Sequence, residues 1–253
     1  MNYNIINYKW RLKVENLLDK TIGFLLFQYK KRDNMFNFFY NSLVYQHVTC
    51  AEYSPKYSYY EFGVAGGGSM EIYILALKQF CRKYKFDLNK FHIYAFDSFA
   101  GLPARTGESD SHLHWDKGLM VHQEDEVLKK IRRQKFPRKN FHIIKGFYEN
   151  SLTDDLRKRL TLFPPSLINI DCDYYSSTAT ALEWLAPFLG SGAIFRFDDI
   201  WAFHGNTDYG ELKAINEFNR GLWGQLTPFP ICGLASYVYI YFRKEFEYGT
   251  KQS

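Results

Sequence analysis

From residue 59 onward, short apolar runs alternate with segments whose apolar residues recur at helical spacing. The apolar runs predict five strands, at Tyr59–Val64, Phe91–Phe96, Phe141–Lys145, Leu167–Ile170 and Ala193–Phe197. The segments between and after them predict helices at Met70–Tyr84, Glu124–Lys135, Leu152–Leu160, Thr178–Phe188 and Glu211–Asn219. Strands that alternate with helices in this way are typical of an α/β fold with a parallel sheet.

The C-terminal part departs from this alternation. Leu226–Ile231 and Ser236–Phe242 predict two strands with no helix between them, and the pattern over Tyr237–Phe242 strongly favours a strand. Two strands joined without a crossover helix pair antiparallel, so one antiparallel strand is expected at an edge. The sequence therefore predicts a doubly wound, mostly parallel, seven-stranded sheet, the Rossmann-like layout of class I methyltransferases.

Residues 1–58 predict a helical N-terminal extension, followed by the main domain over residues 59–253. Apolar residues between Trp10 and Leu26 recur at helical spacing, and a second apolar cluster between Phe36 and Tyr45 predicts another helix. Two interpretations are open at this point. The helices pack on the main domain, or they form a lid or a dimer contact over the active site.

Composition narrows the class of protein. A chain of 253 residues is long enough for one large α/β domain with a sizeable core. The four cysteines are far apart and form no CxxC pair, which argues against zinc and against a disulfide framework and favours a reducing cytoplasm. The apolar run Ile22–Phe27 is far shorter than the about 20 residues that span a bilayer, and the N-terminus lacks a signal-peptide pattern.

The charge balance is mildly basic. A net charge of +5 permits anionic partners without requiring them. The densest basic run, Lys129–Lys139, is interpreted as a solvated helix face, because no aromatic RNA-binding motif lies beside it. No nucleic-acid partner is therefore expected.

The glycine-rich segment Glu61–Ser69 lies between a predicted strand and a predicted helix, the context that a nucleotide-binding loop requires. Asp97 ends the next strand, where a carboxylate can accept hydrogen bonds from both hydroxyls of a ribose. The gap from Gly68 to Asp97 is longer than the roughly 20 residues of a dinucleotide fingerprint, which disfavours NAD and favours S-adenosylmethionine. The alternative is that Asp97 only caps the turn that follows it.

Four acids follow the fourth and fifth predicted strands. Asp171 and Asp173 are two residues apart, and Asp198 and Asp199 end the next strand along the chain. The ends of parallel strands meet at one edge of a sheet, and carboxylates at such an edge suit Mg²⁺. The alternative is that Asp198 and Asp199 form a solvated strand end, while Asp173 caps a helix beginning near Ser176.

Five segments resemble the macrocin O-methyltransferase family. They are Glu61–Ser69, Phe96–Pro103, Lys145–Leu152, Ile170–Thr178 and Phe197–Asp199, in this order, within a resemblance that covers roughly residues 58–242. The resemblance implies a sugar O-methyltransferase that depends on S-adenosylmethionine and Mg²⁺. The implied metal ligands are Asp171, Asp198 and Asp199, which leaves Asp173 as general base, although Asp171 and Asp173 can exchange these catalytic roles.

The same segments imply where the methyl donor binds. The expected cofactor-binding residues are Glu61, Gly63, Val64, Ala65, Gly66, Ser69, Asp97, Ser98, Phe99, Gly146, Phe147, Asp171 and Cys172. The expected acceptor is a hydroxyl of a sugar, a glycosylated natural product or a glycan. A catechol-like or amine acceptor, or a non-catalytic relative that binds S-adenosylmethionine, is the alternative. A homo-oligomer is also possible.

The long polar loop over residues 98–120 and the segment after the fifth strand hold further candidates. His112, His114 and His122 are either solvated side chains, acceptor contacts or an alternative base. His204 is a candidate for acceptor contact. Trp115 either stacks on the acceptor or anchors the loop.

Overall fold

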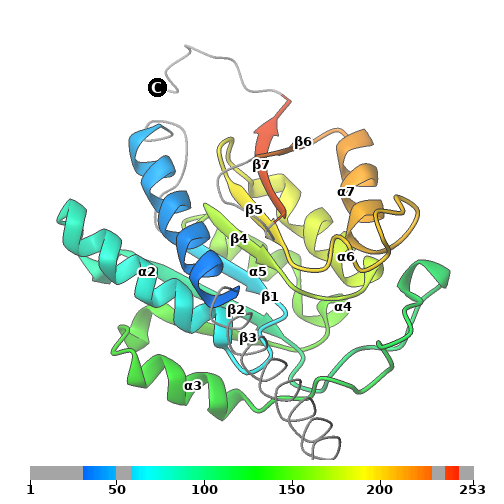
Figure 1. The fold of residues 1–253 in the computed structure, drawn as a ribbon, viewed down its shortest axis with the longest axis horizontal. Coiled ribbons are helices and arrows are strands. Elements are labelled where there is room, and N and C mark those ends of the chain that lie inside the picture. Colours follow the sequence, from blue (N-terminus) through cyan, green and yellow to red (C-terminus); the bar gives the residue numbers. More distant parts are fainter. Residues whose placement is uncertain (1–30, 50–57, 230–236, 245–253) are drawn as a thin grey trace, which may run out of the picture.

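The structure, a computed structural model, describes residues 31–49, 58–229 and 237–244. Its strands form one sheet in the order β3-β2-β1-β4-β5-β7-β6 (Figure 1). They are β1 (Ser58–Phe62), β2 (His92–Asp97), β3 (Phe141–Lys145), β4 (Leu167–Ile170), β5 (Ile194–Phe197), β6 (Gly224–Pro228) and β7 (Tyr237–Arg243). β7 runs antiparallel to its two neighbours, β5 and β6, and every other pair of neighbouring strands is parallel. The predicted doubly wound, mostly parallel sheet is confirmed.

Helices cover both faces of this sheet. They are a helix over residues 31–48, α2 (Gly68–Tyr84), α3 (Glu124–Arg133), α4 (Tyr148–Ser151), α5 (Asp154–Leu160), α6 (Tyr175–Leu185) and α7 (Gly210–Arg220). Short 3₁₀ turns occur at Leu88–Lys90, Glu108–Asp110, Arg138–Asn140 and Ala186–Phe188. The helix over residues 31–48, α2 and α3 pack on one face, and α5, α6 and α7 on the other (Figure 1).

Each strand therefore contributes to two apolar clusters. In β1, Tyr59 belongs to the cluster beneath α2, and its neighbour Tyr60 belongs to the cluster beneath α6. Every residue of β1, β4 and β5 is buried. Strands buried on both faces form continuous apolar runs rather than alternating ones, which is why these runs were visible in the sequence.

Several boundaries differ from the expected ones. The helix expected at residues 152–160 begins at Asp154, because Thr153 caps α5 by accepting a hydrogen bond from Leu156 N at 3.2 Å, and the short helix α4 before it was not predicted. The helix expected from Thr178 begins earlier, at Tyr175. β1 ends at Phe62 rather than Val64, because Gly63 has a φ of +81°, which no strand residue adopts.

The helix over residues 31–48 is part of the main core. Phe38 and Phe39 are fully buried, and the Phe39 ring lies 5.5 Å from the Tyr59 ring and 5.4 Å from the Tyr73 ring. Gln46 Nε2 donates a hydrogen bond to Ser166 O at 2.5 Å, before β4 begins. The second predicted N-terminal helix therefore packs on the main domain. The first, between Trp10 and Leu26, lies outside the described residues.

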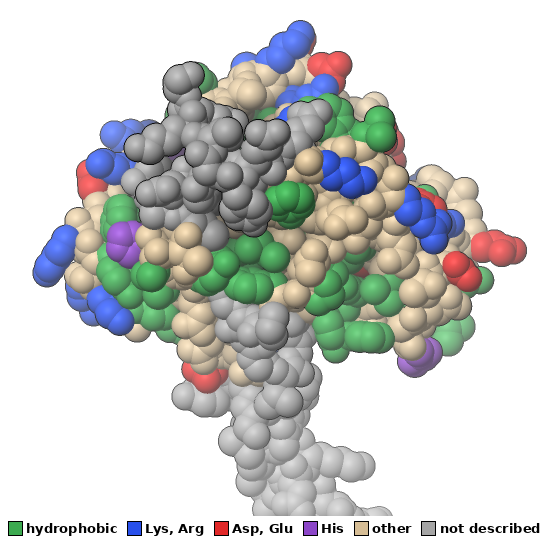
Figure 2. All heavy atoms as spheres, turned by 90° about the horizontal axis from the view of Figure 1, so that it is seen from above, with side chains coloured by type: hydrophobic (Ala, Val, Ile, Leu, Met, Phe, Trp, Pro, Cys, Tyr) green, Lys and Arg blue, Asp and Glu red, His purple; other side chains and the backbone are tan. Residues whose placement is uncertain are grey.

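The surface agrees with the mild net charge. On the face in Figure 2, Lys and Arg side chains are scattered around the rim and do not gather into one patch. None of the helices in the described ranges is both long enough and apolar enough to cross a membrane.

Replacement of Phe39 by Ala tests whether the N-terminal helix belongs to the core. Loss of a buried phenyl ring is expected to lower the free energy of unfolding by about 3–5 kcal/mol. Val48, in the same helix, is 68% exposed, so Val48→Ala is the matched control. Chemical denaturation followed by circular dichroism measures both. Similar small losses in the two variants would contradict a core role for this helix.

Candidate active site

A cleft opens at the carboxyl ends of β1, β2, β3 and β4, beside the point where the strand order reverses. Open α/β sheets bind their ligands at such a position. The cleft is lined by Gly63, Ala65, Asp97, Ser98, Gly101, Leu102, Pro103, Met120, Gly146, Phe147, Tyr148, Glu149, Asp171, Cys172, Asp173 and Ser177.

Gly63 lets two strand ends meet at the floor of this cleft. A Cβ atom on Gly63 would lie 1.7 Å from the main-chain oxygen of Asp171, so no larger residue fits. Two main-chain hydrogen bonds keep these strand ends in register, from Gly63 N to Phe96 O at 3.0 Å and from Asp171 N to Phe62 O at 2.9 Å. The close approach places the glycine segment directly beside the first acid.

Asp97 holds the glycine segment in place. Its Oδ2 accepts hydrogen bonds from Val64 N at 2.7 Å and Ala65 N at 2.9 Å. Its Oδ1 accepts one from Phe99 N at 2.7 Å, so Asp97 also caps the turn that follows it. Oδ1 keeps capacity for a further donor, and Asp97 lines the cleft. Turn capping and ligand binding are therefore compatible here.

The other residues predicted for the cofactor divide into two groups. Those that line the cleft are Gly63, Ala65, Asp97, Ser98, Gly146, Phe147, Asp171 and Cys172. Those that lie outside its wall are Glu61, Val64, Gly66, Ser69 and Phe99.

Glu61 is fully buried behind the wall. It accepts hydrogen bonds from Tyr59 Oη at 2.5 Å and from the Ser69 hydroxyl, which tie β1 to the first turn of α2. Burial raises the pKa of Glu61 to about 7, against the opposing effect of these two hydroxyl donors. Glu61 and Ser69 therefore support the glycine segment from behind.

The four acids after β4 and β5 lie together. Their carboxyl groups are close enough for the pKa of each to depend on the others. Burial and then the charge of Asp198 raise the pKa of Asp171 well above its usual range. Burial and then Asp199 raise the pKa of Asp173 to about 7, and burial and then Asp198 raise that of Asp199 to about 6.

Asp198 behaves differently from the other three acids. Burial favours a higher pKa, but the Arg196 guanidinium and the Lys31 ammonium outweigh burial and lower it. Arg196 Nη2 contacts Asp198 Oδ1 directly, and Lys31 Nζ lies 4.0 Å from Asp198 Oδ2. Asp198 is therefore the acid that the protein itself keeps ionised.

Asp173 does not cap α6, so the capping interpretation is wrong. The N-cap residue of α6 is Tyr174, whose side chain accepts no capping hydrogen bond. The cap comes from Asp110 in the long loop, which accepts hydrogen bonds from Ser176 N at 2.9 Å and from Ser176 Oγ at 2.8 Å. Asp173, with a φ of +62°, is one of the residues that line the cleft.

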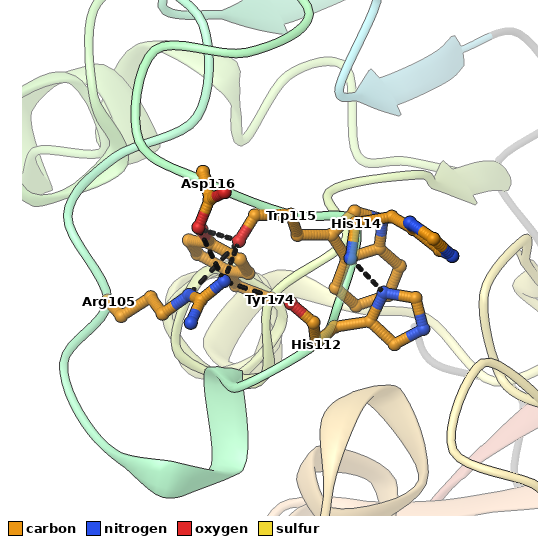
Figure 3. A network of polar contacts seen from close by, with 6 residues as sticks. All are labelled: Arg105, His112, His114, Trp115, Asp116 and Tyr174. Atoms are coloured by element: carbon orange, nitrogen blue, oxygen red, sulfur yellow. Dashed lines mark hydrogen bonds and ion pairs between the residues drawn. The ribbon is translucent and has the colours of Figure 1, made fainter.

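The long loop is fastened to the domain at its base. Arg105 Nη2 donates hydrogen bonds to His112 O at 2.9 Å and to Asp116 Oδ1 at 2.8 Å, and Arg105 Nε donates to Trp115 O at 3.0 Å (Figure 3). Tyr174 Oη donates to Trp115 O at 3.2 Å, next to Asp173. Trp115 is only 6% exposed, so it anchors the loop.

None of the four histidines lines the cleft. The His112 ring packs 4.2 Å from the Trp115 ring, and burial lowers its pKa. His122 Nδ1 lies 3.1 Å from Glu126 Oε2 on the surface of α3. His114 and His204 are exposed. The structure thus does not bring a histidine to the acids as an alternative base.

The carboxylate groups of the four acids are suitable ligands for a hard cation such as Mg²⁺. Closely packed carboxylates with raised pKa values repel one another, and Mg²⁺ prefers such oxygen ligands. In residues 31–49, 58–229 and 237–244, no three His, Cys, Asp or Glu side chains already converge on a single metal position. Arg196 occupies one oxygen of Asp198 instead. The carboxylate oxygens are therefore suitable ligands for Mg²⁺, but they are not already arranged around one metal position.

Sequence reasoning missed several residues of this site. Leu102, Pro103, Met120, Tyr148, Glu149 and Ser177 line the cleft without having been predicted. Arg196 and Glu211 surround the acids from behind: Glu211 is buried, and its Oε2 accepts a hydrogen bond from Asp199 N at 3.0 Å. Of these residues, only Arg196 could have been noticed in the sequence, because a charged residue within the apolar run of β5 is unusual.

A family model described as macrocin O-methyltransferase (TylF) matches residues 57–220, more than half of the chain. The chain belongs to the macrocin O-methyltransferase family. It is therefore an S-adenosylmethionine-dependent O-methyltransferase, as the resemblance implied. No curated protein matches its sequence.

Solved structures show the same fold for this family member. The calicheamicin methyltransferase CalS11 has a TM-score of 0.62 at 18% identity, over 92% of this chain and 86% of that one. The O-methyltransferase NovP has a TM-score of 0.57 at 17% identity, over 85% of this chain and 79% of that one. At such identities the similarity concerns the fold.

Replacement of Asp97 by Asn tests the organisation of the cofactor cleft. An amide keeps one acceptor oxygen but turns an NH₂ group toward main-chain N–H donors, so the glycine segment loses part of its support. We expect binding of S-adenosylhomocysteine to weaken by about tenfold or more, measured by calorimetry.

Asp155→Asn is the matched control for this change. The Asp155 side chain is 90% exposed on α5, away from the cleft, and the control should bind like the parent protein. Equal affinity of Asp97→Asn and Asp155→Asn would refute the role given to Asp97.

Proposed function

We propose that this family member is a Mg²⁺-dependent enzyme that methylates a hydroxyl group of a sugar, either free, nucleotide-linked or part of a glycosylated product. The observation that carries the proposal is the position of Asp173, which lines the cleft, has a pKa of about 7 and lies in a cluster with Asp171, Asp198 and Asp199. The likeness to a structure described as a TDP-rhamnose 3'-O-methyltransferase, with a TM-score of 0.50 at 18% identity, supports a sugar acceptor.

Asp171, Asp198 and Asp199 would hold the metal. Mg²⁺, when bound there, lowers the pKa of an acceptor hydroxyl and orients it. S-adenosylmethionine supplies an electrophilic methyl group. The protein's own residues do the remaining work: Gly63 and Asp97 shape the donor site, and the acids define where the acceptor oxygen lies.

Asp173 is the proposed general base. A carboxylate with a pKa near 7 accepts a proton effectively at neutral pH. The acceptor O–H proton passes to Asp173, a new O–CH₃ bond forms, and the S–CH₃ bond breaks. Because Asp110 caps α6, no helix terminus competes for the Asp173 oxygens.

The setting of the protein is proposed from its cysteines and its surface. Cys81 and Cys172, the cysteines of the described ranges, are free and buried, which agrees with a reducing cytoplasm. The scattered basic side chains of Figure 2 agree with a small acceptor rather than a nucleic acid. We propose no particular oligomeric state.

Removal of divalent cations tests the metal. Treatment with EDTA should abolish methyl transfer from S-adenosylmethionine, and added Mg²⁺ should restore it. Mass spectrometry of a panel of nucleotide sugars, glycosides, catechols and amines measures the product. Methylation of an amine without any metal would point to the alternative acceptor class.

Replacement of Asp173 by Asn tests the base. Asn tolerates the positive φ of this position, so the fold should persist. We expect the turnover number to fall by about 10²- to 10⁴-fold while the affinity for S-adenosylhomocysteine stays unchanged. Asp155→Asn serves again as the control. A turnover number close to that of the control would assign the base to another group.

A further inference from the structure

Arg196 is a buried charge in the centre of the sheet. It is only 3% exposed, and it lies in β5 among apolar residues. Register pairing places Glu61, Asn169 and Arg196 side by side on β1, β4 and β5. They form a buried polar row across the sheet, on the face that α2 and the helix over residues 31–48 cover. A guanidinium so deep in a protein is stable only with partners.

The partners of Arg196 lead directly to the acid cluster. Nη1 donates a hydrogen bond to Asn169 Oδ1 at 2.8 Å, which fixes the plane of the guanidinium. Nη2 donates to Asp198 Oδ1, where the strand ends. The row therefore connects the core beneath the sheet to one proposed metal ligand.

Lys31 approaches the same carboxylate from the other side. Its Nζ lies 4.0 Å from Asp198 Oδ2, and its side chain is 52% exposed. The two oxygens of Asp198 thus face two cations of the protein. Among the described residues Asp171 and Asp199 form no ion pair, and burial together with the neighbouring charge of Asp198 raises the pKa of both, against the opposing effect of Arg196.

We infer that Arg196, supported by Lys31, is a resident counter-cation for Asp198, with which a divalent cation must compete. Arg196 is then a positioning residue, which lets the acids pack together without metal and keeps the metal weakly held. This inference rests on the proposed Mg²⁺ site. Removal of the resident charge should therefore strengthen metal binding, whereas loss of an ordinary structural contact would weaken it or leave it unchanged.

Direct measurement of Mn²⁺ binding by electron paramagnetic resonance tests the competition. Arg196→Gln keeps an N–H donor but removes the charge, so it should bind Mn²⁺ about tenfold more tightly than the parent protein. Arg196→Lys keeps the charge and should restore an affinity close to that of the parent. Arg133→Gln is the matched control, because Arg133 pairs with Glu71, on α2 and away from the cleft.

Thermal unfolding supplies a second readout. Without metal, Arg196→Gln should melt at a lower temperature than the parent, because buried acids lose their counter-cation. Added Mg²⁺ should raise its melting temperature by more than it raises that of the parent. An equal rise in both proteins would overturn the inference.

If Arg196→Gln does not fold, Lys31→Gln tests whether the protein's own cations compete with a divalent cation for Asp198. Lys31 is half-exposed, so its replacement leaves the core intact, and Mn²⁺ binding should strengthen by about two- to threefold. Unchanged Mn²⁺ affinity in the variants that fold overturns the inference while leaving the proposed metal site in place. If the parent protein itself binds no Mn²⁺, the inference and the proposed metal site fail together.

Discussion

The contact between Gly63 and the main chain of Asp171 is the constraint on which the rest of the site depends. A single missing side chain allows the end of β1 to pass within van der Waals reach of the end of β4. The glycine segment and the acids therefore share one cleft, although more than a hundred residues separate them in the chain. The proposed donor site and the proposed base thus depend on the same close approach of two neighbouring strand ends.

Charged side chains lie on several sides of this contact between β1 and β4. Asp97 and Glu61 support the glycine segment, one from within the cleft and one from behind it. The four acids lie farther along the sheet edge, and Arg196 lies beneath them. Glu61, Arg196 and Asp198 each have a hydrogen-bond partner, which lowers the free-energy cost of burying their charges, whereas Arg196 Nε and Glu211 Oε1 have no partner. The chemistry of the site follows from a polar row built into an otherwise apolar sheet.

Much of this fold was predictable from the sequence, since strands buried on both faces leave continuous apolar runs. The acids at the strand ends and the glycine segment were predictable for a related reason, because parallel strands bring their carboxyl ends to one edge. The role of Asp173 was only partly accessible. Asp110 caps α6 in place of Asp173 by accepting a hydrogen bond from Ser176 N. Asp110 is 66 residues away from Ser176 in the chain, so no local sequence pattern predicts this contact.

The same limit applies to residues whose partners are distant in sequence. Trp115 was open to two interpretations until its carbonyl was found to accept hydrogen bonds from Arg105 and Tyr174. Glu61 and Ser69 were predicted to bind the cofactor; neither lines the cleft, and the Ser69 hydroxyl donates a hydrogen bond to Glu61. Side-chain direction depends on packing, which a pattern of residue types does not encode.

The fastening of the long loop has a consequence for how this scaffold can diversify. Arg105, Asp110 and Trp115 bind the two arms of the loop to each other and to α6. In the apex between them, His112 takes part in that fastening through its main-chain oxygen, whereas the Leu113 side chain is 92% exposed. Insertions or exchanges at the apex can therefore accumulate without disturbing the base of the loop. Mutational tolerance at the exposed apex is thus separated, within one loop, from the residues Gly101, Leu102, Pro103 and Met120 that line the cleft.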